Sequence, residues 1–394
     1  MSVPLLSDPH DFADLCGHIR ETGLVAFDTE FVSEHTYQPD LGLLQFATPD
    51  RCVAVDPYRV GDLAPWWEIM ADDTTDVVAH GCQAEIRFCL TLFGRRPRRL
   101  LDVQLAEGFR STSYPLAYRS LVVRVLGKRI HSGETRTDWR KRPLSDRQLE
   151  YALEDVRYLP SIWNRQLTSL RTRSRLEWFE AEMERLIDDI ERDLRGDTWV
   201  KLPGVQKFSR RELAVVRELA DWRREEAERR NRPLRQILRD DLVVELAKRQ
   251  PRSMKDLMRT RDMNRPSYKR SATEFLECIE RGVGVPDEEC PVSPPTLSRN
   301  RMDDQALGQL LGMALTDRCA ELKLAKQIVG TSADLKEFVG WHLAGRAGGP
   351  PKLADGWRAD VSGELLKDLL EGRISVRVGD PESSNPLVFE RLEG

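Results

Sequence analysis

The stretch Leu24-Val25-Ala26-Phe27-Asp28-Thr29-Glu30 joins a short apolar run to two acidic residues. The apolar run follows Gly23 and has the composition of a buried strand. Because side chains at positions i and i+2 of a strand point to one face, Asp28 and Glu30 are expected to project together from its end. Two carboxylates this close repel each other unless a cation neutralises them, and Mg²⁺ and Mn²⁺ prefer oxygen ligands. The stretch therefore predicts a metal site, although an acidic, solvated strand end would show the same residues.

Further apolar runs extend this strand into a predicted sheet. They are Leu41–Ala47, Cys52–Val55 and Val77–Ala79, and a turn separates the first two. A helical pattern covers Ile86 to Phe93, and helices dominate from about Leu116 onward. This order of strands and helices predicts an α/β domain, built as a mixed sheet flanked by helices.

Two other motifs offer polar side chains to the same region. Tyr151 and Asp155 stand four residues apart on a predicted helix, so they share a face and are able to hold a water between a phenol and a metal. The alternative is a tyrosine packed on the core beside an exposed Asp155. His80 directly follows the fourth predicted strand, and Glu85 adds a carboxylate five residues later. A histidine in such a position is more often packed or hydrogen-bonded than a metal ligand.

The order and spacing of the three motifs resemble those of the DEDD superfamily of 3′–5′ exonucleases, and in detail its ribonuclease D branch. Glu150 stands where a second subgroup has histidine, so Tyr151 matches the tyrosine subgroup. The resemblance implies a ribonuclease H-like mixed sheet. It rests on the segments FDTEF (27–31), LGLLQFA (41–47), LLDVQLAEGF (100–109) and TRTDWRKRPLSDRQLEYALEDVRYL (135–159).

The resemblance also implies a chemistry. Two divalent metal ions, Mg²⁺ or Mn²⁺, would be held by carboxylates, and Tyr151 would position the attacking water, so that RNA is hydrolysed to nucleoside 5′-monophosphates. The expected metal ligands are Asp28, Glu30, Glu85 and Asp155, which with Tyr151 form the expected catalytic set. The expected substrate-binding residues are Phe31, Gln45 and His80, with Phe31 stacking on a base, although each is equally consistent with a structural role.

One position departs from the family pattern. The family has aspartate where this chain has Glu85, which keeps the charge and adds a methylene group. The backbone compensates for the longer side chain, or Glu85 ligates a metal directly where aspartate would act through water, or the second metal site is weakened. Glu85 therefore leaves open a non-catalytic RNA-binding scaffold. A 3′–5′ DNA exonuclease is a separate alternative, because such enzymes use the same acidic residues.

Composition changes after the break at Leu202-Pro203-Gly204. Residues 207 to 281 carry 21 Lys and Arg against 14 Asp and Glu, although the whole chain has a net charge of −4. This segment resembles the HRDC domain through Glu218–Arg224, Arg232-Pro233 and Pro251-Arg252-Ser253, and its charge favours phosphate contacts. We predict an exonuclease domain over 1–200, an all-α HRDC domain over 205–284, a linker over 285–300, and a second all-α HRDC-like domain over 301–394.

The remaining expectations concern location and partners. Seven scattered cysteines without a C-x-x-C pair predict reduced thiols, and we expect neither a signal peptide nor a membrane span, so a cytoplasmic protein. The family implies a monomer that acts on tRNA precursors and other small structured RNAs with a free 3′ end.

Overall fold

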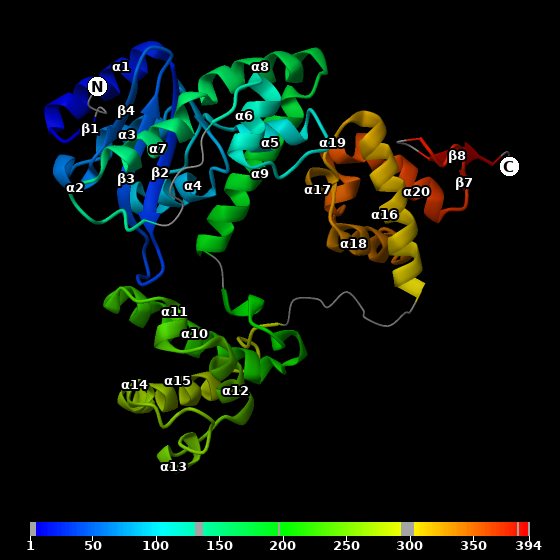
Figure 1. The fold of residues 1–394 in the computed structure, drawn as a ribbon. Coiled ribbons are helices and arrows are strands. Elements are labelled where there is room, and N and C mark those ends of the chain that lie inside the picture. The colour runs from blue at the N-terminus through cyan, green and yellow to red at the C-terminus, as the bar shows by residue number, and fades with distance from the viewer. Residues whose placement is uncertain (1–4, 131–136, 196–197, 293–302, 384–385, 393–394) are drawn as a thin grey trace.

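The computed structural model describes residues 5–130, 137–195, 198–292, 303–383 and 386–392. In the described part of the chain, no helix combines the length and the apolar character that a membrane span requires. All seven cysteines are free thiols. Figure 1 shows three parts: an α/β domain, a separate helical domain below it, and a C-terminal region beside it.

The first domain is built on a six-stranded sheet of order β1-β4-β3-β2-β5-β6. Strand β2 runs antiparallel to β3 and parallel to β5, so the predicted mixed sheet is confirmed. The strands are β1 (Leu5–Leu6), β2 (Leu24–Val32), β3 (Asp40–Ala47), β4 (Cys52–Val55), β5 (Asp76–Ala79) and β6 (Leu100–Asp102).

Helices cover both faces of this sheet. On one face, the Phe27 ring packs against Phe46 and Trp66, with 4.5 Å between the centroids of Phe27 and Trp66. On the other face, Leu43 packs with Ala152 of α7. The helices of this domain are α1 (Pro9–Thr22), α2 (Pro57–Val60), α3 (Ala64–Met70), α4 (Gln83–Phe88), α5 (Val103–Gly108), α6 (Tyr118–Leu126), α7 (Asp146–Arg157), α8 (Leu159–Thr172) and α9 (Leu176–Arg195), and α4 continues into a π-helical turn, Cys89–Phe93.

The helical domain has a hydrophobic core of its own. Its helices are α10 (Arg210–Arg230), α11 (Leu234–Ile237), α12 (Asp240–Arg249), α13 (Met254–Leu257), α14 (Pro266–Arg270) and α15 (Ala272–Gly284), preceded by the 3₁₀ turns Thr198–Lys201 and Val205–Lys207. The core also includes Trp199 and Leu202, which lie before the predicted start at residue 205. This core therefore favours a domain boundary near residue 198.

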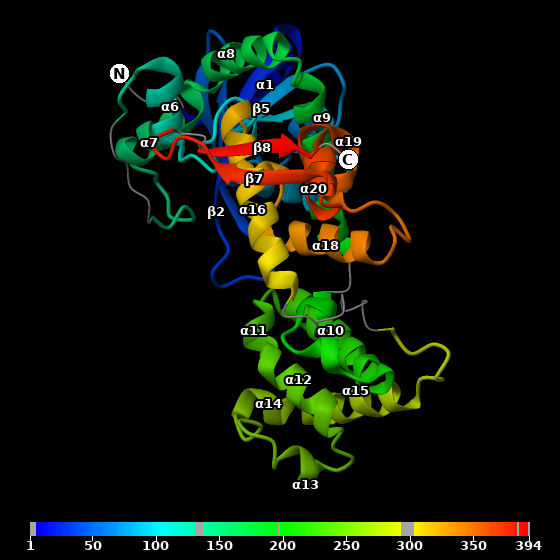
Figure 2. The same ribbon diagram turned by 90° about the vertical axis from the view of Figure 1, so that its right-hand side faces the viewer.

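The C-terminal region is helical, as predicted, but it ends in a hairpin that the helical pattern did not anticipate. Its elements are α16 (Asp303–Leu322), α17 (Lys326–Val329), α18 (Ser332–Leu343), the 3₁₀ turn Lys352–Ala354, α19 (Gly356–Arg358), the π-helical turn Ala359–Gly363, α20 (Glu364–Leu370), β7 (Ile374–Val378) and β8 (Leu387–Arg391). Figure 2 shows the hairpin beside α16 and α20. Ile374 and Val376 of β7 and Phe389 of β8 pack against the core, whereas Val378 at the end of β7 is exposed.

The C-terminal region and the first domain share one continuous core. The backbone N–H of Ala325 donates to the Gly108 carbonyl at 2.8 Å, and a Cβ at Gly108 would stand 2.1 Å from Ile328 Cδ1. Buried Arg358 also donates to the Glu182 carboxylate of α9. This region is therefore packed as a fixed part of the α/β domain, whereas the helical domain has a separate core.

Candidate active site

Strand β2 presents the first two carboxylates to helix α7. In the antiparallel ladder, Asp28 lies opposite Gln45 and Glu30 lies opposite Leu43. Opposite residues share a face, and Leu43 packs beneath α7, so Asp28 and Glu30 face the same helix. A bulge interrupts the ladder directly after Glu30. The alternation of the strand therefore turns both acids toward the element that carries Tyr151.

Helix α7 supplies the next two groups. Its Ser145 capping box sets where the helix starts, and its apolar side, which includes Ala152 and Leu153, packs on the sheet. Tyr151 and Asp155 are both half-buried and lie one turn apart. Hydrogen bonding from Tyr151 and the charge of Arg119 both favour the ionised form of Asp155. Burial outweighs them, and the pKa of Asp155 rises to about 6.

Glu85 approaches the strand from helix α4. Its side chain is buried, and the Thr29 hydroxyl donates to Glu85 Oε1 at 2.7 Å. Asp102 secures the start of α4, since its carboxylate accepts the backbone N–H groups of Gly81 at 3.0 Å and Cys82 at 3.3 Å. Burial raises the pKa of Glu85 to about 7, and the Thr29 hydrogen bond opposes that rise. Glu85 is thus held against the residue between Asp28 and Glu30.

The charges of Glu85 and Asp155 act on the two carboxylates of β2. Burial raises the pKa of Asp28 well above its usual range, and the charges of Glu85, Asp155 and Glu30 raise it further. Burial, then Asp155 and Glu85, raise the pKa of Glu30 to about 8. Charges raise a carboxyl pKa in this way only at short range, which agrees with the Thr29–Glu85 hydrogen bond and with the position of Asp28 and Glu30 facing α7. The structure therefore brings together the acidic residues that the sequence places in three separate motifs.

A loop anchored on the sheet supports Tyr151. The Trp139 ring stacks on Tyr151 with 6.4 Å between centroids, and a Cβ at Gly42 would stand 2.8 Å from Trp139 Cβ. Arg142 donates two hydrogen bonds to the Asp56 carboxylate, at 2.7 and 2.8 Å, and a third to the Gly42 carbonyl at 2.8 Å. Trp139 and Arg142 therefore hold the loop that precedes α7.

The three expected substrate-binding residues differ in position. Phe31 is half-buried, with its ring edge-on to Phe88 at 5.3 Å. His80 lies with Nε2 2.9 Å from the Leu116 carbonyl, which matches the alternative of a hydrogen-bonded, packed histidine. Gln45 has no exposed surface, and both of its amide atoms lack a partner in the described part of the chain. The Gln45 side chain therefore does not reach the surface that a nucleotide would contact.

Sequence reasoning missed two residues of this site. Thr29 orients Glu85, and the charge of Arg119 limits the rise that burial causes in the pKa of Asp155. The position of Thr29 between two acids was visible in the sequence, but its contact with a residue 56 positions later was not.

The donor set fits a divalent cation. Within the described ranges, no three His, Cys, Asp or Glu side chains are arranged as a ready-made ligand group. Glu85 is engaged with Thr29, and Tyr151 hydrogen-bonds to Asp155. The fit rests instead on the chemistry of four clustered carboxylate groups, whose raised pKa values a dication would lower again.

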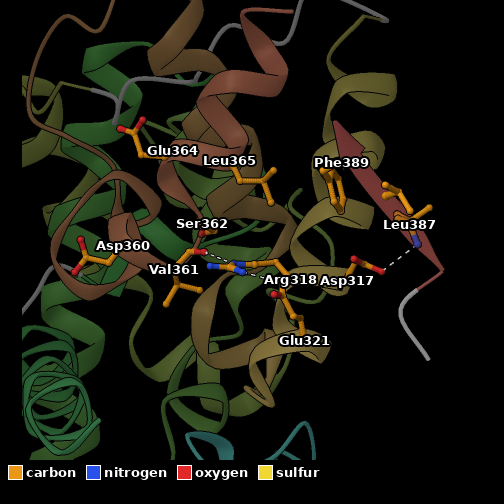
Figure 3. Close-up of a pocket in the computed structure, with 11 residues that line it drawn as sticks. Asp317, Arg318, Glu321, Asp360, Val361, Ser362, Glu364, Leu365, Leu387 and Phe389 are labelled. Carbon is orange, nitrogen blue, oxygen red and sulfur yellow. Dashed lines mark hydrogen bonds and ion pairs between the residues drawn. The ribbon is translucent and has the colours of Figure 1, made fainter. Parts of the chain in front are cut away.

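A cavity lies in the C-terminal region. Its volume is about 470 Å³, and Figure 3 shows its lining from α16, the Ala359–Gly363 turn, α20 and β8. Arg318 donates to the Val361 carbonyl at 3.2 Å, and the Asp317 carboxylate accepts the backbone N–H of Leu387 at 3.4 Å. None of its lining residues belongs to the carboxylate cluster, so the cavity is separate from the candidate active site.

Two parts of the chain match known protein families. Residues 5–170 match a 3′–5′ exonuclease family, and residues 212–279 match the HRDC domain. The fold and the acidic site thus define a 3′–5′ exonuclease, a hydrolase, with an appended HRDC domain.

Full-length relatives define the family more narrowly. Ribonuclease D of Sphingobium indicum is 30% identical over 382 residues, covering 95% of this chain and 96% of that protein. Ribonuclease D of Gluconacetobacter diazotrophicus is 31% identical over 376 residues, covering 95% and 94%. The crystal structure of Escherichia coli RNase D superposes with a TM-score of 0.82 at 25% identity, covering 94% of this chain and 99% of that one. The chain belongs to the ribonuclease D family.

Proposed function

We propose that this protein hydrolyses RNA from the 3′ end and releases nucleoside 5′-monophosphates, with precursors of tRNA and other small structured RNAs as substrates. The observation that carries the proposal is the convergence of Asp28, Glu30, Glu85 and Asp155. Glu85 is hydrogen-bonded to the residue between Asp28 and Glu30, and the charges of Glu85 and Asp155 raise the pKa of both strand carboxylates. The similarity of this chain to Escherichia coli RNase D, which is described as an exoribonuclease involved in structured RNA processing, supports RNA as the substrate.

The four carboxylates are the proposed ligands of two divalent cations, Mg²⁺ or Mn²⁺. Such ions, when bound, supply an activated water and stabilise the charge on the leaving oxygen. Asp28 is the proposed shared ligand, because it is the group on which the other three all act. Glu30 and Asp155 flank it from β2 and α7, and Glu85 reaches it from α4.

Tyr151 is proposed to position the attacking water. Burial and the Asp155 charge raise the pKa of its phenol, so the hydroxyl keeps its proton near neutral pH. A protonated phenol donates a hydrogen bond and does not act as a base. Stacking on Trp139 restricts the ring, so the hydroxyl is held in place.

The HRDC domain is proposed to contact the sugar-phosphate backbone of the RNA. Its sequence carries the net positive charge that phosphate contacts need, while the rest of the chain is acidic. Contacts of this kind hold RNA without reading its sequence. The proposed active unit is the monomer.

The proposal is tested with matched RNA and DNA oligonucleotides of one sequence, each labelled at the 5′ end. We expect stepwise shortening of the RNA with Mg²⁺ or Mn²⁺, none with a chelator, and much slower shortening of the DNA. Equal rates on DNA and RNA would favour the DNA exonuclease alternative. A protein that binds the RNA but does not shorten it with either metal would contradict the proposal.

A further inference from the structure

The HRDC domain contacts the α/β domain at the loop that follows the catalytic strand. The side chain of Asn231 accepts hydrogen bonds from the backbone N–H groups of Tyr37, at 3.0 Å, and Gln38, at 3.2 Å. These two residues lie in the connection between β2 and β3. Figure 1 shows this connection extending from the sheet to α11, and Figure 2 shows the same approach from the side.

A second observation locates the same contact. The pKa of Tyr37 is raised by burial and by the charge of Glu228, and lowered in part by Arg224. Arg224, Glu228 and Asn231 are spaced by four and three residues, so they follow one face of α10 up to its C-cap. The Tyr37 phenol is therefore partly buried and within electrostatic range of the last two turns of α10.

Asn231 suits this position because of its backbone. It ends α10 in the left-handed conformation, with φ 45° and ψ 54°, which asparagine and glycine adopt readily. A short amide at this cap can turn outward and accept hydrogen bonds from two N–H groups of another segment.

Two exposed arginines, Arg232 and Arg235, follow Asn231 in the chain. No ion pair is found for either among the described residues.

The contact between Asn231 and the β2–β3 loop lies close in sequence to the proposed catalytic carboxylates. Strand β2 carries Asp28 and Glu30, ends at Val32, and leads into the loop that holds Tyr37. RNA with its 3′ end at these carboxylates has its upstream nucleotides outside the site. The HRDC domain is held at the loop that follows the catalytic strand, where Arg232 and Arg235 can contact the phosphates of these upstream nucleotides.

We propose that Asn231 is a positioning residue that clips the HRDC domain to the β2–β3 loop and thereby sets the preference for RNA long enough to reach that domain. This inference rests on the proposed RNA exonuclease function. The clip contributes to binding of the upstream RNA and not to the chemical step. Its loss raises KM for long substrates and leaves kcat and the rate on very short ones unchanged.

The test compares a trinucleotide with a hairpin RNA that carries a single-stranded 3′ tail. Asn231→Gly keeps the left-handed cap and removes the acceptor, and Asn231→Asp keeps an acceptor oxygen. Gln250→Gly is the matched control, because Gln250 ends α12 with nearly the same backbone angles, φ 45° and ψ 57°. We expect Asn231→Gly to raise KM for the tailed hairpin by about tenfold, the effect of two modest hydrogen bonds lost from a pre-organised domain.

Each outcome decides the proposal. Support requires that Asn231→Asp and Gln250→Gly resemble the wild type, and that Asn231→Gly changes KM for the hairpin but not the trinucleotide rate. The clip is overturned if Asn231→Gly leaves KM for the hairpin unchanged relative to the trinucleotide rate, or if Gln250→Gly raises KM for the hairpin as much as Asn231→Gly does. Either result leaves the nuclease function intact. A wild type that shortens neither RNA overturns the proposed function, and the clip with it.

Discussion

The Thr29 hydroxyl donates a 2.7 Å hydrogen bond to Glu85 Oε1, so the residue between two strand carboxylates holds a third one from helix α4. Glu85 stands where relatives are expected to have aspartate. Its extra methylene is therefore accommodated by a specific contact, and the carboxylate remains within the electrostatic reach of Asp28.

Removal of the Thr29 hydroxyl is expected to disturb this arrangement. Thr29→Val keeps the shape of the side chain but removes the hydroxyl that donates to Glu85, and the loss of a hydrogen bond to a buried charged group costs about 1.5–3 kcal/mol. We expect a fall in kcat of about tenfold or more on a short RNA. Thr29→Ser, which retains the hydroxyl, is the control, and equal kcat values for the valine and serine variants would refute the role of this contact.

Glu85 itself is expected to be adapted to its longer reach. Glu85→Asp withdraws the carboxylate by one methylene from Thr29, so we expect lower activity in spite of the restored family residue. Glu85→Gln removes the charge and should lower kcat further and raise the metal concentration needed for half-maximal rate. Titration of Mg²⁺ and Mn²⁺ against initial rate measures both effects, and a more active Glu85→Asp would show that glutamate is a costly departure.

The metal-free protein is expected to become less stable as the pH rises from about 5 to about 8. Folding raises the pKa of Glu30 from 4.5 to about 8 and the pKa of Glu85 from 4.5 to about 7. Between pH 4.5 and about pH 8, the folded protein therefore binds more protons than the unfolded chain. The cluster's contribution is therefore fully present below pH 4.5 and is lost as the pH rises toward about 8.

This dependence is measured as Tm against pH in the presence of a chelator. The wild type should lose stability between about pH 5 and pH 8 relative to a Glu30→Gln, Glu85→Gln double variant. Added Mg²⁺ should restore more stability at the high end of that range, where the carboxylates are ionised. Parallel curves for the two proteins would contradict the raised pKa values.

Gly42 is expected to be required beneath Trp139. A methyl group at residue 42 would lie 2.8 Å from Trp139 Cβ and from the Trp139 carbonyl oxygen, so Gly42→Ala forces the loop before α7 to move. We expect a loss of about 1–3 kcal/mol in the free energy of unfolding, typical of overpacking, and a lower kcat because Tyr151 stacks on this tryptophan. Gly17→Ala is the control, because an added Cβ at this α1 position meets nothing within 4 Å. A Gly42→Ala protein as stable and active as Gly17→Ala would refute this.

Regular spacing made part of this site predictable. Period-2 alternation placed Asp28 and Glu30 on one face, and the i, i+4 rule placed Tyr151 and Asp155 together, because both patterns are local. The hydrogen bond from Thr29 to Glu85 joins distant segments, and the burial of Gln45 depends on how α7 covers β3. Neither has a local signal in the sequence.

The C-terminal region shows the same limit. Its helices were predictable from their patterns, but strands β7 and β8 were overlooked among them. The core that this region shares with the α/β domain rests on contacts such as that between Ala325 and Gly108. Such packing follows from the three-dimensional fit of small and large side chains, so a length-based division into domains could not reveal it.

The most direct test of the central claim is the shortening of a 5′-labelled RNA by Asp155→Asn and Glu150→Gln, with metal present. Both variants change one acid of α7 to its amide, but Asp155 belongs to the carboxylate cluster and Glu150 is exposed. We predict a stepwise 3′ ladder for the wild type and Glu150→Gln, and loss of the ladder for Asp155→Asn. A ladder of unchanged rate from Asp155→Asn would show that this cluster is not the catalytic centre.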